Sequence, residues 1–318
     1  MAAIRNTALE AGFAMTPSSQ HKPGPRPRSV YARALKLLCG SGVEFVVGGG
    51  YAFQRYTGIP RHTRDLDVFV RPDDVERVLA LFAHAGFKTT LPFPHWLGKV
   101  YKGRTYIDVI FNSGNGLTRV DDDWFEHAVA DEVLGVPVKL SPVEEMIWSK
   151  AFIQERERFD GSDILHLLLE CSSHLDWKRM LDRFGEHDVV LFGHLASFVY
   201  VYPTEAWRVP DWVWHRLDAS LLKSRRRTHT APKICRGTLY SRTQYIVDLE
   251  RGFRDARLPP DGDMRHDDVA IWTEAARTQK TGVPEERIVE HVEVLRTGAR
   301  PRRAPPGDRV HVPKRAAP

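Results

Sequence analysis

The sequence has few cysteines and no long apolar run. Its 318 residues include three cysteines, Cys39, Cys171 and Cys235, whose odd number and wide separation match neither a disulfide framework nor a zinc site. The longest apolar stretch, residues 189–202, is shorter than the roughly 18–20 residues that a membrane-spanning helix needs. The first 20 residues also lack the unbroken apolar segment of a signal peptide. We therefore expect a cytoplasmic protein with no membrane contact.

Several common catalytic patterns are absent as well. The sequence contains no HExxH motif, no Walker A motif and no recognisable Ser-His-Asp arrangement, which argues against a zinc protease, a P-loop enzyme and a serine hydrolase. The net charge is +5, from 46 basic and 41 acidic residues, and much of the excess lies toward the two ends. This mild excess permits an anionic partner such as a nucleotide or RNA but does not require one, and solvated surface charge is the favoured explanation.

The pattern of apolar residues predicts an α/β fold: a small mixed sheet with flanking helices, followed by an all-helical domain. Strands are expected at residues 44–47, 65–70, 99–102 and 105–112, and residues 133–140 are expected to form a further strand or a hairpin around Gly135. Early helices are expected at 30–39, 51–57 and 72–85. Later helices are expected at 142–157, 161–171, 175–184, 187–201, 211–223, 266–278 and 285–295, the first of them capped by Ser141. The resulting organisation is a disordered leader (1–28), an α/β domain (29–140), a helical domain (141–224), a basic extension with short helices (225–296) and a disordered basic tail (297–318).

The most informative stretch runs from Phe45 to Val70, FVVGGGYAFQRYTGIPRHTRDLDVFV. On a strand the side chains alternate between faces, so Asp65 and Asp67 share one face while their apolar neighbours point to the other. Two adjacent carboxylates repel each other unless a cation lies between them. This pair therefore indicates a cation site on a rigid strand.

A third carboxylate and a glycine turn complete the pattern. Asp108 lies among apolar residues on a separate predicted strand, and pairing of the two strands would bring three carboxylates to one face. Such oxygen ligands suit Mg²⁺ (or Mn²⁺), and two ions held in this way can promote phosphoryl transfer. The turn at Gly48–Gly50 lets the backbone and the next helix N-terminus approach a triphosphate.

These motifs resemble those of the nucleotidyltransferase superfamily that includes DNA polymerase beta. The similarity consists of an apolar residue before Gly49-Gly50, a short helix, the Asp65-Leu66-Asp67 strand and Asp108 on a later strand. The local form GGYA…G-x-x-R-x-T-R-D-L-D looks most like the minimal prokaryotic branch, including the AbiEii-like toxin nucleotidyltransferases. It covers about residues 31–140 well and the helices at 142–171 more loosely.

The resemblance implies a metal-dependent transfer of a nucleoside monophosphate from a nucleoside triphosphate to an acceptor, with release of pyrophosphate. It implies Asp65, Asp67 and Asp108 as catalytic and metal-binding residues. It also implies Gly49, Gly50, Arg61, Thr63 and Lys150 as nucleotide-binding residues. The acceptor is left open among RNA, protein and a small molecule, and analogy with the toxin branch adds an antitoxin-like protein as a candidate partner.

Other interpretations remain open. The two aspartates can be solvent-facing residues of an edge strand, and the glycines can form a plain turn. Arg61 can be a surface charge, and Lys150 can belong to a solvated helix face. At the level of function, the alternatives are a non-catalytic nucleotide- or RNA-binding module with the same fold and a small-molecule adenylyltransferase of the aminoglycoside type.

Overall fold

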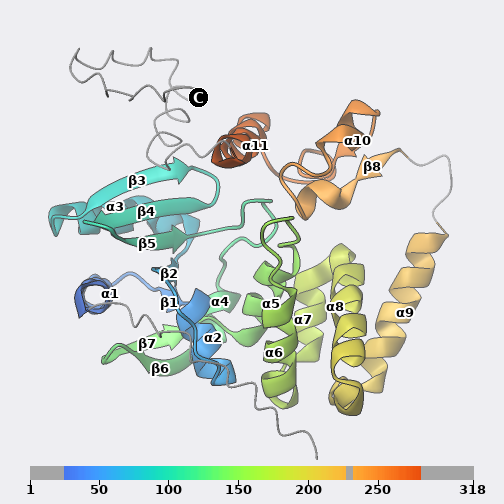
Figure 1. Ribbon diagram of the computed structural model, residues 1–318, viewed down its shortest axis with the longest axis horizontal. Coiled ribbons are helices and arrows are strands. Elements are labelled where there is room, and N and C mark those ends of the chain that lie inside the picture. The colour runs from blue at the N-terminus through green and yellow to red at the C-terminus, as the bar shows by residue number, and fades with distance from the viewer. Residues whose placement is uncertain (1–24, 227–231, 281–318) are drawn as a thin grey trace, which may run out of the picture.

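The computed structural model describes residues 25–226 and 232–280 (Figure 1). The predicted helix at 285–295, the basic tail and most of the leader lie outside these ranges. The first helix, α1 (Pro25–Cys39), begins at Pro25, so the last four residues assigned to the leader are helical. Within the described ranges, no helix combines the length and apolar character needed to cross a membrane.

A seven-stranded mixed sheet forms the first part of the chain, in the order β3-β4-β5-β2-β1-β7-β6 (Figure 1). Its strands are β1 (Val46–Val47), β2 (Asp65–Phe69), β3 (Lys88–Phe93), β4 (Leu97–Lys102), β5 (Thr105–Ile110), β6 (Val129–Val133) and β7 (Val136–Leu140). The β2–β5 and β1–β7 pairs are parallel, and the other pairs are antiparallel. The predicted α/β fold class is thereby confirmed.

Both edge strands of this sheet differ from expectation: β3 was not expected, and β6 is the first arm of the hairpin allowed around Gly135 but begins at Val129, before the predicted segment. A separate parallel pair, β8 (Ile234–Cys235) and β9 (Arg254–Asp255), was not expected either. Pro92 lies within β3, and proline is compatible with an edge strand because its missing N–H leaves no partner unsatisfied there. Strand β6 carries Asp131 and Glu132 on an exposed outer edge and therefore lacks the apolar alternation of a half-buried strand. Tertiary pairing, rather than local pattern, makes these segments strands.

Helices α1, α2 (Gly49–Thr57) and α3 (Val75–His84) accompany the sheet. Leu66 and Val68 of β2 and Ile107 and Val109 of β5 are fully inaccessible to solvent and belong to the main apolar core. The alternate residues of both strands, which include all three aspartates, are only half-buried. Burial of one side of each strand therefore fixes which side presents the carboxylates.

The second part of the chain is helical, as predicted, and its helices pack side by side (Figure 1). They are α5 (Val143–Ala151), α6 (Gly161–Cys171), α7 (Trp177–Phe184), α8 (Asp188–Val201) and α9 (Asp211–Arg225). Helix α5 ends six residues before the predicted end at residue 157, so Arg156 is not helical. Glu155 instead accepts hydrogen bonds from Ser241 Oγ (2.6 Å) and Arg242 N (3.0 Å), contacts that no local pattern reveals.

The predicted capping role of Ser141 is wrong. The helix begins at Val143, Pro142 occupies the N-cap position, and the Ser141 hydroxyl is buried without a hydrogen-bond partner. Ser141 instead extends the β1–β7 pairing, because its N–H donates to Val47 O (2.9 Å). Its carbonyl accepts a hydrogen bond from the Tyr56 hydroxyl (2.8 Å). Ser141 is therefore held by the sheet and does not cap α5.

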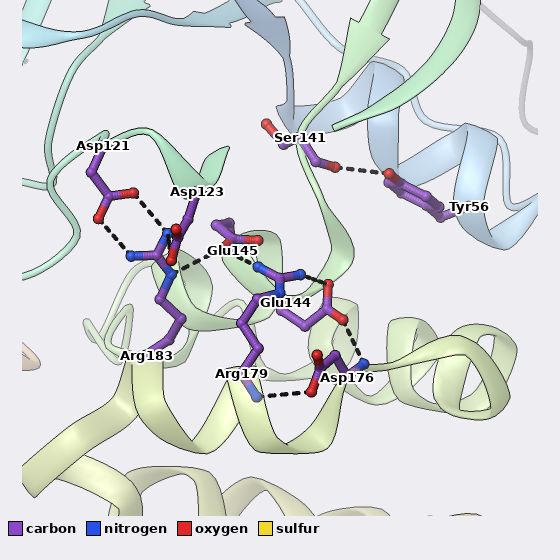
Figure 2. A network of polar contacts seen from close by, with 9 residues as sticks. All are labelled: Tyr56, Asp121, Asp123, Ser141, Glu144, Glu145, Asp176, Arg179 and Arg183. Atoms are coloured by element: carbon purple, nitrogen blue, oxygen red, sulfur yellow. Dashed lines mark hydrogen bonds and ion pairs between the residues drawn. The ribbon is translucent and has the colours of Figure 1, made fainter. Parts of the chain in front are cut away.

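An ion-pair network, buried at its centre, fixes α5 against α7 and against the segment after β5 that carries Asp121 (Figure 2). Arg179 pairs with Glu144 and with Glu145, whose side chain is fully buried. Arg183 binds Glu145 at 2.9 Å and reaches Asp121 at 2.6 Å. Glu144 and Glu145 each accept two hydrogen bonds, which offset part of the loss of hydration, while Glu145 Oε2 and Arg179 Nε are buried without a hydrogen-bond partner. The network is therefore sensitive to the loss of one partner.

We expect Arg179→Ala to lower the free energy of unfolding by about 3–5 kcal/mol, because it leaves Glu144 and Glu145 buried with less compensation. Urea unfolding followed by circular dichroism measures this change. Lys178→Ala is the matched control, since Lys178 and Asp182 form an exposed pair on the same helix. Equal midpoints for the two variants would show that the network does not stabilise the fold.

Candidate active site

The pairing of β2 with β5 brings the three predicted aspartates together. The strands run parallel, with Asp67 directly opposite Asp108 and Asp65 one position along the same face. Carboxylate oxygens of Asp65, Asp67 and Asp108 all lie within 4.8 Å of one another. Three acidic side chains from two neighbouring strands thus converge on a single point above the sheet.

This convergence has an electrostatic consequence for the central residue. Burial, followed by the negative charges of Asp65 and Asp108, raises the pKa of Asp67 from 3.8 to about 8. The three carboxyl groups therefore do not all ionise together near neutral pH unless positive charge is supplied to them.

Lys99 supplies part of that charge, and the sequence analysis did not identify it. Its Nζ lies 3.3 Å from Asp108 Oδ1 and 4.6 Å from the centre of the Tyr106 ring, and the side chain is buried. A pattern in the sequence does predict that Lys99 lies opposite Asp108. The two-residue turn at Gly103-Arg104 places Lys102 opposite Thr105, and counting back along the hairpin places Lys99 opposite Asp108.

The glycine turn approaches the aspartates closely. Gly49 opens α2 with a φ of +54°, and a Cβ at this position would lie 1.6 Å from Asp67 Oδ2. The Gly48 N–H donates to Asp67 O at 3.1 Å. A residue with a side chain at position 49 would therefore have to displace the Asp67 carboxylate, so glycine is needed to place the α2 N-terminus beside it.

Thr63 and Arg61 have different positions relative to this cluster. The Thr63 hydroxyl donates to the Asp65 carboxylate and lies 3.1 Å from Asp65 O, so it orients that side chain. Arg61 pairs with Asp163 of α6 and stacks 4.5 Å from the centre of the Phe53 ring. Arg61 therefore bridges α2 and α6 and is not among the residues that line the cavity described below.

Lys150, predicted to bind the nucleotide, projects from the last turn of α5. Its Nζ lies 2.8 Å from Asp160 Oδ2 and 2.9 Å from Asp163 Oδ2. Arg158 also binds Asp160, at 3.0 Å. These acidic partners hold the two cations at the rim of the carboxylate cluster, where they also weaken the repulsion felt by Asp67.

A cavity of about 490 Å³ contains the cluster. Its walls come from the glycine turn, β2, β5 and the loop after it, α5, and a segment near the C-terminus. Besides the predicted site residues, the cavity is lined by Trp96, Asn112, Ser113, Asn115, Trp124, Ser149, Glu155, Thr238, Ser241, Arg242 and Trp272. Sequence reasoning missed these residues because most of them come from loops and from a segment more than 80 residues away.

The carboxylate cluster fits a hard divalent cation. It offers only oxygen ligands, at mutual distances that one ion or a pair of ions can bridge. The raised pKa of Asp67 indicates that the site lacks sufficient positive charge without such an ion. Asp65, Asp67 and Asp108 are therefore the residues of the described chain best arranged to hold Mg²⁺ or Mn²⁺.

Comparison with known proteins agrees with this geometry. The model of the aminoglycoside-2''-adenylyltransferase family matches residues 31–129, the segment that contains the glycine turn and all three aspartates. The match confirms the resemblance to the nucleotidyltransferase superfamily. It also supports the prediction that the protein is an enzyme that transfers a nucleoside monophosphate. The matched family is not the AbiEii-like branch that the local motif suggested. No curated protein matches the sequence.

Solved structures show a distant likeness. The solution structure of the antibiotic-resistance factor ANT(2'')-Ia is 15% identical, with a TM-score of 0.37, over 52% of this chain and 95% of that one. The lincomycin-bound lincosamide adenylyltransferase LnuA is 17% identical, with a TM-score of 0.33, over 44% of this chain and 94% of that one. A nucleotidyltransferase-like protein from Paracoccidioides brasiliensis is 16% identical, with a TM-score of 0.41, over 57% of this chain and 90% of that one.

The raised pKa of Asp67 predicts a pH-dependent effect of Asp67→Asn on stability in buffer with EDTA. Below pH 3.8, the ordinary value, Asp67 is protonated in both the folded and the unfolded chain. As the pH rises toward 8, the unfolded chain ionises while the folded carboxyl stays protonated, so the folded state loses stability. The asparagine of the variant cannot ionise, and we expect the variant to melt several degrees above the wild type at pH 8.

The melting temperatures of the two proteins should converge near pH 4, as measured by differential scanning fluorimetry. Asp131→Asn is the control, because the hydrogen bond from Arg55 lowers the pKa of Asp131 and its loss should not raise the melting temperature at pH 8. An Asp67→Asn variant that melts below the wild type at pH 8 would contradict the assigned repulsion.

Proposed function

We propose that the protein transfers AMP from ATP to a hydroxyl group of a small-molecule acceptor, in a reaction that depends on Mg²⁺ or Mn²⁺. The observation that carries the proposal is the convergence of Asp65, Asp67 and Asp108 beside the glycine turn in one cavity. The cavity volume of about 490 Å³ falls in the range typical of small-molecule sites, roughly 300–1,000 Å³. The family match supports adenylyl transfer in particular.

The reaction forms one bond and breaks another. The acceptor oxygen attacks the α-phosphorus of ATP, the bond from that phosphorus to the bridging oxygen breaks, and pyrophosphate leaves. Asp65, Asp67 and Asp108 would hold the divalent cation, which would supply charge stabilisation and alignment of the reacting groups. Asp108 is the carboxylate best placed to receive the acceptor's proton, because it lies on the β5 side of the cluster, away from the glycine turn.

The leaving phosphates belong on the opposite side, against the glycine turn. The N-terminus of α2 begins at Gly49 beside Asp67, and its free backbone N–H groups and dipole favour an anion there. Lys150 and Arg158 lie on the wall of the same cavity. Their partners Asp160 and Asp163 keep both cations in place, so they can bind phosphate oxygens without a large loss of side-chain freedom.

This proposal narrows the choice of acceptor and of protein partner. A small-molecule acceptor takes precedence over RNA or protein, because the cavity that the aspartates line has a volume typical of small-molecule sites. Neither the described residues nor the matched family gives a reason to include an antitoxin-like partner.

We expect the double variant Asp65→Asn/Asp67→Asn to lose nucleotidyl transfer by about 100-fold or more, because it can no longer hold the cation. The assay measures pyrophosphate release from each of the four nucleoside triphosphates with Mg²⁺ and either tobramycin or lincomycin as acceptor. ATP is expected to be the preferred donor. Asp73→Asn, on the exposed start of the 3₁₀ turn before α3, is the matched control.

Circular dichroism of the double variant should match that of the wild type, so that lost activity reports on the chemistry rather than on folding. Full activity in the double variant would refute the proposal. If the wild type binds ATP but releases no pyrophosphate with either acceptor or with the small-molecule fraction of a cell lysate, a non-catalytic binding module is the better description.

A further inference from the structure

We propose that a segment near the C-terminus, residues 232–276, forms the acceptor-binding wall of the active site, with Trp272 as its main contact. This inference rests on the proposed function and assigns a role to a part of the chain beyond the family match. Thr238, Ser241, Arg242 and Trp272 line the same cavity as the three aspartates, although more than 100 residues separate them from Asp108. The site is therefore built from both ends of the described chain.

The sheet order places this wall on the side where an acceptor must enter. The glycine turn lies between β1 and α2, on the β1–β2 side of the carboxylates, and Trp96 and the β5 end lie on the opposite side. Trp272 packs 5.0 Å from Trp96, ring centre to ring centre. In an in-line displacement the acceptor approaches opposite the leaving group, so pyrophosphate at the glycine turn requires the acceptor at the Trp96–Trp272 side.

Packing fixes the segment to the sheet. Helix α11 (His266–Lys280) buries Ile271 and Ala275 against Phe93 and Leu97 of the β3–β4 hairpin, and it lies beside that hairpin in Figure 1. Gly114 follows β5, and a Cβ there would lie 2.2 Å from the Trp272 ring. The absence of a side chain at position 114 therefore allows the indole to lie against the loop that leads out of the site.

Hydrogen bonds fix the segment at a second point. Asn115 Nδ2 donates to Leu239 O at 2.8 Å, which joins the β5 loop to the turn before Ser241. Arg242 donates from Nε to Glu155 Oε1 at 3.2 Å and lies 4.2 Å from the centre of the Trp272 ring. Burial by itself raises the pKa of the Glu155 carboxyl, but the hydrogen bonds from Arg242 and Ser241 and the positive charge of Arg242 outweigh it, so the pKa lies below its ordinary value, in keeping with a charged pair.

The chemistry of the wall indicates the class of acceptor. The partly exposed indoles of Trp96 and Trp272 offer apolar surface, and Asn112 and Ser149 offer polar side chains nearby, whereas the Ser241 hydroxyl is already bonded to Glu155. Arg242 is already paired with Glu155, so the wall presents little net charge. A ring-bearing compound with several hydroxyl groups suits this combination, because its ring face packs on the indoles while its hydroxyls bond to the polar side chains.

The test compares Trp272→Ala and Trp272→Leu with the wild type. Leucine keeps apolar volume for the docking of α11 but lacks the indole plane, so it remains informative if the alanine variant fails to fold. We expect both changes to raise the KM for tobramycin or lincomycin, whichever the wild type modifies, by about 10-fold. The Kd for Mg²⁺-ATP, measured by calorimetry without acceptor, should stay within about two-fold. Trp272→Phe should recover most of the loss.

Trp207→Ala is the matched control, because this tryptophan is 73% exposed and does not line the cavity. An unchanged acceptor KM, or a weakened Kd for Mg²⁺-ATP with the KM unchanged, would overturn the assignment while leaving the proposed function intact. Retained activity in the Asp65→Asn/Asp67→Asn variant would instead refute the proposed function.

A second measurement needs no acceptor. If the wall excludes water from the acceptor side, Trp272→Leu should increase the hydrolysis of ATP to AMP and pyrophosphate by a few fold, since water then takes the place of the acceptor hydroxyl. If the wild type modifies neither probe, an increase in hydrolysis supports the wall, and an unchanged rate overturns it.

Discussion

The repulsion among three carboxylates is the constraint on which this structure depends. Asp67 and Asp108 face each other across parallel strands, with Asp65 beside them, and the pKa of Asp67 records the unfavourable charge density. An arrangement of this kind survives only where other terms hold the strands in register. Here the opposite sides of β2 and β5 are fully buried, so a register shift of one residue would move the aspartates into the core. Hydrophobic burial thus enforces a geometry that electrostatics alone would oppose.

The neighbouring residues reduce the repulsion without abolishing it. Lys99 of β4 lies against Asp108, and Lys150 and Arg158 approach from the helical part, where acidic partners also hold them. Because these cations are themselves paired, they leave a net demand for positive charge at the centre of the cluster. A divalent cation meets that demand better than another lysine would, since it contacts several carboxylates at once. The charged side chains around the cluster therefore leave a negative site that favours binding of a divalent cation.

The sequence predicted the parts of this site that depend on local pattern. Alternation along β2 assigned Asp65 and Asp67 to one face, and the position of Asp108 among apolar residues indicated its strand. The features that escaped prediction depend on contacts between distant residues. Helix α5 ends at Ala151, and beyond it Glu155 bonds to Ser241 and Arg242, while Ser141 continues the sheet instead of capping a helix. Trp272 carried no local sign of its place, because its position follows from α11 docking on the β3–β4 edge and from the space beside Gly114.

These distant contacts also connect the two sides of the site. At its beginning, α5 is held by Glu144 and Glu145 through Arg179 and Arg183, and near its end it presents Lys150 to the cavity. In the irregular segment that follows, Arg158 pairs with Asp160 and Glu155 pairs with Arg242. One short helix and its extension thus position Lys150 in the cavity that contains the carboxylates and hold the segment that carries Ser241 and Arg242. Because catalysis by positioning requires both sides to be fixed relative to the carboxylates, the ion pairs around α5 contribute to the site although none of Arg179, Arg183 and Glu145 lines the cavity.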